Sequence, residues 1–120
     1  MSVKNNGRLL VCPVETALEM LSGRWKARIL WKLHRQTMRY SELRRGLPGI
    51  TEKMLTQQLR QLEQDNLVTR TVYPGVPPKV EYSLSDFGLT LSPILDSIAE
   101  WGVRNRPHIV EVMQHHGTKQ

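Results

Sequence analysis

The chain has 120 residues, of which 39% are hydrophobic and 23% charged, and these values exclude a disordered chain and fit one folded domain. No apolar run approaches the roughly 20 residues that a membrane-spanning helix needs, and the polar first residues lack the pattern of a signal peptide. The single cysteine excludes an intramolecular disulfide framework, so we expect a cytoplasmic protein with no membrane partner.

The net charge of +6 is concentrated in one stretch of the chain. Between Gly23 and Arg60, ten basic residues stand against two acidic ones, whereas the segments on either side are balanced or slightly acidic. A basic block in an otherwise balanced chain indicates a polyanionic partner, although a solvated basic surface would give the same composition.

The first part of the chain is predicted to be helical. Pro13 suits the first turn of a helix that Gly23 ends, and a second helix is expected over residues 25–33. Residues 38–40 predict a very short strand, and Ser41 is the expected N-cap of a short third helix.

A fourth helix has the strongest local signal. Thr51 is a suitable N-cap, and Leu55, Leu59 and Leu62 form an inward stripe at helical spacing. Asn66 is expected to end the helix in a left-handed conformation. The opposite face of this helix carries polar and basic side chains, namely Lys53, Gln57, Arg60 and Gln64.

The pattern then changes to that of strands. Residues 67–72 and 80–84 alternate between apolar and polar, and the proline-rich residues 73–78 separate them, so a hairpin is predicted. After it, Ser85 is expected to cap a long last helix that Pro93 kinks or breaks. We expect this helix to end at Gly102, with one further short helix over residues 109–113 in the tail.

A short helix, a Gly-containing turn and an amphipathic helix followed by a hairpin are the parts of a winged helix-turn-helix domain. The predicted fold is therefore mainly α with a small β-hairpin wing, over residues 13–102, between an N-terminal arm (1–12) and a C-terminal tail (103–120). The fourth helix buries its leucines, which leaves its other face free to enter a DNA major groove, where Gln reads adenine and Arg reads guanine.

Two groups of residues are expected to contact double-stranded DNA. From the fourth helix these are Thr51, Lys53, Thr56, Gln57 and Arg60. Four further residues are expected to contact backbone phosphates or a minor groove. These are Arg39, Ser41, Arg70 on the first strand of the wing, and Lys79 at the base of the wing.

Other functions fit the sequence less well. Polar residues opposite a leucine stripe also occur on any solvated helix, and a winged helix can serve protein–protein contact, but neither needs so basic a block. No catalytic constellation, phosphate loop or metal-ligand spacing is present. We therefore expect no enzyme activity, no cofactor and no metal.

Segments from nearly the whole chain match the pattern of one family of regulators. The matching segments are Cys12-Pro13-Val14-Glu15, Gly23-Arg24-Trp25-Lys26, Arg39-Tyr40-Ser41-Glu42-Leu43, residues 50–59, Leu62-Glu63, residues 73–84, Gly88, Leu95 and Trp101. Any one of these segments is weak evidence, but their combination is specific. Over residues 12–102 the sequence therefore resembles the HxlR-type winged helix-turn-helix regulators of bacteria. The clearest departure is Gly75, where an acidic residue is more usual.

The resemblance implies a sequence-specific transcriptional regulator that acts as a homodimer, joined through its first and last helices. The long apolar stripe of the last helix agrees with this, although the stripe would also suit packing on the chain's own core. A two-fold dimer requires a palindromic operator. The expected interface residues are Leu91, Ile94, Ile98 and Trp101.

Several regulators that the chain resembles carry a cysteine just before the first helix and respond through it to oxidants or electrophiles. Thiolates are favoured near helix N-termini, so Cys12 is a candidate sensor of a small reactive effector. With one cysteine per chain, oxidation gives an intersubunit or a mixed disulfide. The alternative is a small apolar residue in the dimer seam, and the sequence leaves both open.

Overall fold

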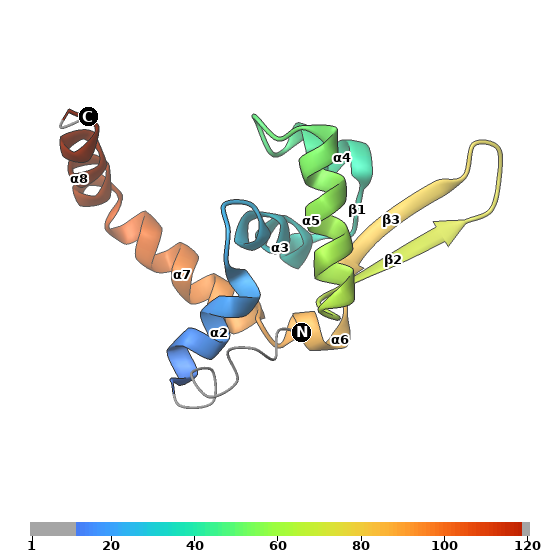
Figure 1. Ribbon diagram of the computed structural model, residues 1–120, viewed down its shortest axis with the longest axis horizontal. Helices are drawn as coiled ribbons and strands as arrows, with labels where there is room; N and C mark the ends of the chain where they lie inside the picture. Colours follow the sequence, from blue (N-terminus) through green and yellow to red (C-terminus); the bar gives the residue numbers. More distant parts are fainter. Residues whose placement is uncertain (1–11, 119–120) are drawn as a thin grey trace. The chain divides into compact units, whose positions relative to one another are not determined.

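A computed structural model describes residues 12–118 of the chain (Figure 1). These residues divide, between Thr90 and Leu91, into two compact units. In chain order, the first unit holds α2 (Pro13–Leu21), α3 (Lys26–Arg35), β1 (Met38–Arg39), α4 (Tyr40–Arg45), α5 (Glu52–Gln64), β2 (Val68–Tyr73), β3 (Lys79–Leu84) and α6 (Asp86–Leu89). The second unit holds α7 (Ser92–Arg104) and α8 (Arg106–Thr118).

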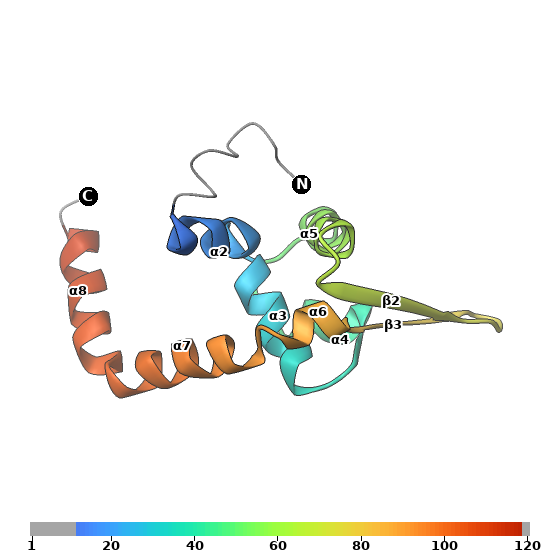
Figure 2. The same cartoon turned by 90° about the horizontal axis from the view of Figure 1, so that it is seen from below.

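The three strands form one antiparallel sheet in the order β1-β3-β2. Along the hairpin, Val68 lies opposite Leu84 and Tyr73 lies opposite Lys79, whereas β1 pairs with β3 over two residues only. The outer part of the hairpin is therefore a two-stranded ribbon, which projects from the helices as a wing (Figures 1 and 2). This arrangement confirms the predicted mainly α, winged helix-turn-helix fold.

The core of the first unit lies between α3, α4, α5 and the sheet. The leucine stripe predicted for α5 is buried, as are the apolar side chains of α3. Leu43, Leu47 and Ile50, from α4 and the turn after it, complete the core. α3 and α5 therefore owe their positions to apolar side chains at helical spacing. The buried apolar residues of this unit are Trp25, Ile29, Leu30, Leu33, Met38, Leu43, Leu47, Ile50, Leu55, Leu59, Leu62, Leu67, Val68, Tyr82 and Leu84.

Several helix starts are those predicted, among them the starts of α2 and α5. Pro13 is the first residue of α2, and Cys12 is its N-cap, whose Sγ accepts a hydrogen bond from the Glu15 backbone N–H at 3.4 Å. The Thr51 hydroxyl caps α5 by accepting from the Met54 N–H at 3.1 Å. Asn66, with a φ of 61°, lies just beyond the end of α5 in the expected left-handed conformation.

The start of α4 differs from the prediction. Ser41 was expected to be its N-cap, but α4 begins at Tyr40 and Arg39 occupies the cap position. The Glu42 carboxylate accepts the Arg39 backbone N–H at 2.7 Å, which is the bond that an acid at the third helical position makes back to the cap residue in a capping box.

The long last helix is interrupted, as Pro93 suggested, but its ends differ from the prediction. α6 ends at Leu89. In a continuous helix the Leu89 carbonyl would clash with the Pro93 ring, and in the structure Pro93 lies in the first turn of α7 instead. Gly102 does not end α7, which continues to Arg104. The tail forms α8, longer than predicted, because Pro107 lies in its first turn, where no backbone N–H is needed.

Candidate nucleic-acid interface

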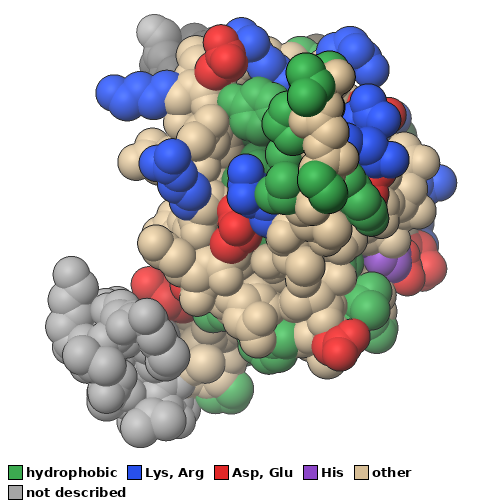
Figure 3. All heavy atoms as spheres, turned by 90° about the vertical axis from the view of Figure 1, so that its right-hand side faces the viewer, with side chains coloured by type: hydrophobic (Ala, Val, Ile, Leu, Met, Phe, Trp, Pro, Cys, Tyr) green, Lys and Arg blue, Asp and Glu red, His purple; other side chains and the backbone are tan. Residues whose placement is uncertain are grey.

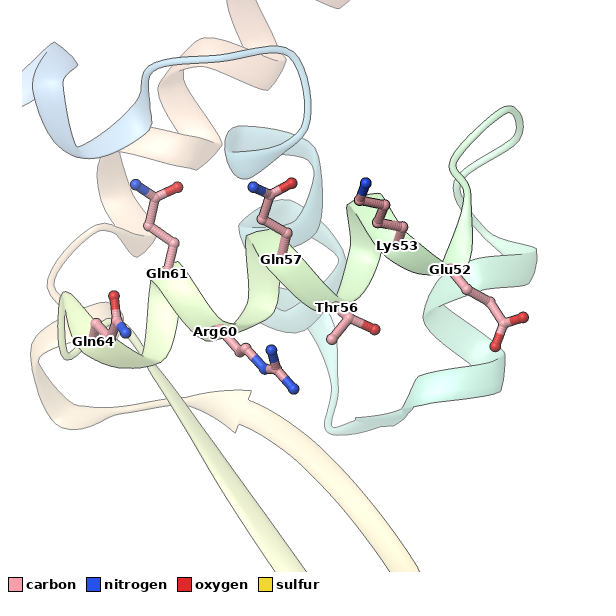
Figure 4. Close-up of a pocket in the computed structure, with 7 residues that line it drawn as sticks. All are labelled: Glu52, Lys53, Thr56, Gln57, Arg60, Gln61 and Gln64. Carbon is pink, nitrogen blue, oxygen red and sulfur yellow. The ribbon is translucent and has the colours of Figure 1, made fainter.

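The exposed face of α5 forms one continuous polar surface. Burial of its leucines turns the other side of the helix outward, where a shallow open hollow runs along it (Figure 4). Lys53, Gln57 and Gln61 point to one side of this face, whereas Thr56 and Arg60 point to the side on which the wing strands run. The residues that line the hollow are Glu52, Lys53, Thr56, Gln57, Arg60, Gln61 and Gln64.

Four of the five predicted recognition residues line this hollow, and Thr51 does not. The Thr51 hydroxyl is committed to the Met54 N–H as the helix cap, although its side chain is exposed. Gln61 was not predicted to contact DNA. It follows Gln57 by four residues, and that spacing alone places both side chains on the same helix face.

Tyr40 connects the start of α4 to the exposed face of α5. Its hydroxyl donates a hydrogen bond to the Glu52 carbonyl at 3.0 Å and lies 3.1 Å from the Thr56 hydroxyl. A phenol has one proton, so the Thr56 hydroxyl is the donor in the second contact. Tyr40 therefore fixes the side chain of Thr56 and the first turn of α5. Sequence spacing gave no sign of this role, because the contact joins residues that are 16 positions apart.

An ion pair also joins the two helices. The Arg44 guanidinium lies 3.5 Å from the Glu52 carboxylate, and both side chains are largely exposed. Exposed pairs of this kind contribute little to stability. Its main effect is electrostatic, because it reduces the negative charge of the one acidic side chain that lines the hollow along α5.

The wing places its cations on the paired strands and not at its tip. Arg70 is exposed on β2, and Arg39 and Ser41 are exposed around the start of α4. Lys79 lies opposite Tyr73 at the outer end of the ladder, which corrects the predicted position at the base of the wing. The Lys79 ammonium lies 3.4 Å from the Glu81 carboxylate and 5.0 Å from the centre of the Tyr73 ring.

The tip of the wing is apolar. Residues 74–78 contain no charged side chain, and the Val76 side chain is fully exposed. On the side from which the wing projects, Figure 3 shows Lys and Arg side chains on both sides of a hydrophobic strip. A polyanion that reached α5 would therefore meet basic side chains around an uncharged projection.

The terminal helices carry apolar side chains that the single chain leaves exposed. In α2 no residue is buried, and Val14 and Leu18 are more than half exposed. In α7, the side chains of Ile94, Ile98 and Trp101 are 47%, 53% and 60% exposed. The fourth predicted interface residue, Leu91, precedes α7 and is partly buried. Such exposed apolar faces are typical of protein–protein contact.

Cys12 is exposed at the start of α2 and is not in a disulfide. Within residues 12–118, no three His, Cys, Asp or Glu side chains cluster in a way that suits a metal ion. Across the same residues, every helix is too short or too polar to cross a membrane.

Comparison with known proteins connects this geometry to a family. Residues 20–110 match the family described as HxlR-like helix-turn-helix. The HTH-type transcriptional regulator YybR of Bacillus subtilis (strain 168) is 50% identical over 95 residues, which are 79% of this chain and 76% of YybR. The family description and the name of this relative describe regulators of transcription and not enzymes.

Solved structures give the same result. The redox regulator HypR in its reduced form has a TM-score of 0.79 and 47% identity, over 83% of this chain and 99% of that chain. Its oxidised form has a TM-score of 0.74 and 50% identity, over 78% and 97% of the two chains. The chain therefore belongs to the HxlR-like helix-turn-helix family and is a helix-turn-helix transcriptional regulator.

Proposed function

We propose that this regulator recognises a specific double-stranded DNA sequence by placing α5 in the major groove. The observation that carries the proposal is the exposed face of α5, where Lys53, Gln57 and Arg60 stand opposite a buried leucine stripe. Gln and Arg have the donor and acceptor geometry that distinguishes base pairs in that groove. Arg39, Ser41, Arg70 and Lys79 would contact the backbone and orient the domain.

The regulator acts in this proposal as a homodimer on a palindromic operator. The exposed apolar side chains of α2 and α7 support a two-fold contact, because two copies would bury surfaces that one chain leaves in water. The two recognition helices would then lie about 34–36 Å apart, or a multiple of that distance, along the DNA. In this scheme residues 13–102 bind DNA and dimerise, flanked by an arm (1–12) and a tail (103–120).

We further propose that Cys12 senses oxidants or electrophiles. Its exposed thiol at the first turn of α2 supports this role, as does similarity to HypR, which is described as a redox regulator. Two Cys12 thiols, one from each subunit, would lose two protons and two electrons to the oxidant and form one S–S bond. A small-molecule thiol would give a mixed disulfide instead. Either product would change the angle between the subunits and hence the spacing of the α5 helices.

The first test is binding of the reduced protein to duplex DNA from its own upstream region, at fixed salt, with excess non-specific competitor. We expect binding that survives competition and a footprint with two-fold symmetry. If the protein instead binds every duplex and the competitor abolishes this binding, recognition is not sequence-specific. That result would favour a winged helix that serves protein–protein contact.

A further inference from the structure

Two arginines are held over one buried indole at the start of α3. Trp25 immediately precedes the helix and is 3% exposed. The guanidinium carbon of Arg24 lies 4.9 Å from the centre of the Trp25 ring, and that of Arg28 lies 4.6 Å from it. Stacking on an aromatic face fixes the plane of a guanidinium and leaves its N–H donors available at its edge.

Neither guanidinium has an anionic partner among residues 12–118 that would neutralise it, and both side chains are exposed. The segment from Gly23 to Arg28 also contains Lys26 and no acid, so the stack lies in an uncompensated positive region. The first backbone N–H groups of α3 add to this potential, since they form the positive end of the helix dipole.

The stack lies beside the start of the recognition helix. A β-carbon built on Gly49 would be 4.0 Å from the Trp25 ring, and Gly49 is two residues before the α5 cap Thr51. α3 begins on the side of the molecule where α5 lies and ends on the opposite side (Figure 2). In Figure 4, the segment that leads into α3 lies on the side of α5 to which Gln57 and Gln61 point, away from the wing.

We propose that Arg24 and Arg28, held in place by Trp25, bind backbone phosphates of the DNA on the side of α5 opposite the wing. Guanidinium groups with fixed planes suit the phosphate oxygens, which accept two parallel N–H bonds. The protein would then contact the DNA backbone on both sides of the major groove, through the wing on one side and through Arg24 and Arg28 on the other. This inference rests on the proposed function.

The test is a double variant, Arg24→Gln with Arg28→Gln, in the full chain. Each phosphate contact contributes about 0.9 to the slope of log affinity against log salt, so we expect the slope to fall by about two units. Affinity for the operator and for non-specific DNA should fall by the same factor, because phosphate contacts carry no sequence information.

Arg35→Gln is a matched control. The Arg35 guanidinium also stacks on an indole of α3, 5.7 Å from the centre of the Trp31 ring, but it lies at the far end of the helix. This variant should leave the salt slope unchanged. A second variant, Arg24→Lys with Arg28→Lys, keeps the charges and should keep most of the slope.

The outcomes separate this inference from the proposed function. If the unaltered chain gives no specific footprint, the proposed function fails whatever the variants do. If it binds its operator and the double Gln variant, folded to the same thermal midpoint, keeps the same slope, the phosphate contact is wrong. A weaker affinity with an unchanged slope would also overturn the inference, because it would show that the arginines only support Trp25.

Discussion

Gly88 lies against the backbone carbonyl of Leu67 so closely that a β-carbon at this position would be 2.1 Å from the carbonyl oxygen. The same oxygen accepts the Ser85 N–H at 3.0 Å, and the Ser85 hydroxyl donates to the Asn66 carbonyl at 2.6 Å. This contact ties α6 to the junction between α5 and the wing. The junction between α5 and the wing therefore packs against a residue that belongs to neither of them.

Replacement of Gly88 by Ala should destabilise the fold, because the contact is with backbone that must shift to make room. We expect the free energy of unfolding to fall by about 1–3 kcal/mol, measured by urea denaturation. Gly102→Ala is the control, since a β-carbon there meets nothing within 4 Å in the interior of α7. That variant should gain roughly 0.5–1 kcal/mol. Equal stability of Gly88→Ala and the parent would refute the close approach.

Tyr40→Phe should loosen the recognition face while keeping the ring in place. Loss of the hydroxyl removes the bonds to the Glu52 carbonyl and to Thr56, so we expect a stability loss of about 0.5–1.5 kcal/mol. Discrimination at the base pair nearest Thr56 should also weaken, measured by binding to single-substitution operators. Tyr73→Phe, on the exposed wing, should leave stability unchanged, and an equal loss in both variants would argue against the Tyr40 bonds.

Arg60 and Lys79 should affect DNA binding in different ways. Arg60→Ala removes the donor that we propose reads a base, so discrimination at one base pair should fall by about 1–3 kcal/mol. Lys79→Ala should weaken all duplexes equally and reduce the salt slope by up to about one unit. Because Glu81 partly neutralises Lys79, Glu81→Gln should steepen the slope. If titrations at several salt concentrations show no change for any of the three, the assigned DNA-facing surface is wrong.

Ile98→Asp should disrupt the proposed dimer, because it places a charge on an apolar face that the partner would cover. We expect a monomer in sedimentation and a loss of at least tenfold in operator affinity. Val103→Asp makes the same kind of change at another exposed position of α7, about 140° around the helix. It should leave the dimer intact, and a dimeric Ile98→Asp protein would exclude this interface.

Cys12→Ser should keep the fold and DNA binding but lose the response to a thiol oxidant. Serine is a better N-cap than cysteine, so α2 should start as it does now. Oxidised parent protein should run as a disulfide-linked dimer, or carry a small thiol, under non-reducing conditions. Persistence of the oxidant response in the serine variant would remove Cys12 as the sensor.

Most of the fold was predictable because local signals agree with tertiary packing. The leucines of α5, the Thr51 cap and the left-handed Asn66 each act within a few residues, and the structure has all three as predicted. The ends of α4, α7 and α8 were missed because the residues used as boundary signals, Ser41, Gly102 and Pro107, are also compatible with positions inside a helix, where the structure has all three.

The site was predictable to the extent that one helix face defines it. Helical spacing identified Lys53, Gln57 and Arg60, whereas the contact between Tyr40 and Thr56 and the approach of Trp25 to Gly49 join distant segments. No periodicity encodes such contacts. The position of Lys79 on the wing also required the strand register, which moved it to the outer end of the ladder.

The three tryptophans differ in their exposure to solvent, so the intrinsic tryptophan fluorescence of the chain can report on separate surfaces. Trp25 is 3% exposed beside the start of α5, whereas Trp101 is 60% exposed on α7. An exposed indole emits at longer wavelength than a buried one, so covering α7 would shift the emission of Trp101 toward the blue. Displacement of the guanidinium groups over Trp25 would instead change its emission intensity. Single-tryptophan variants, titrated in parallel, would thus record subunit association through Trp101 and DNA contact through Trp25 as separate fluorescence signals.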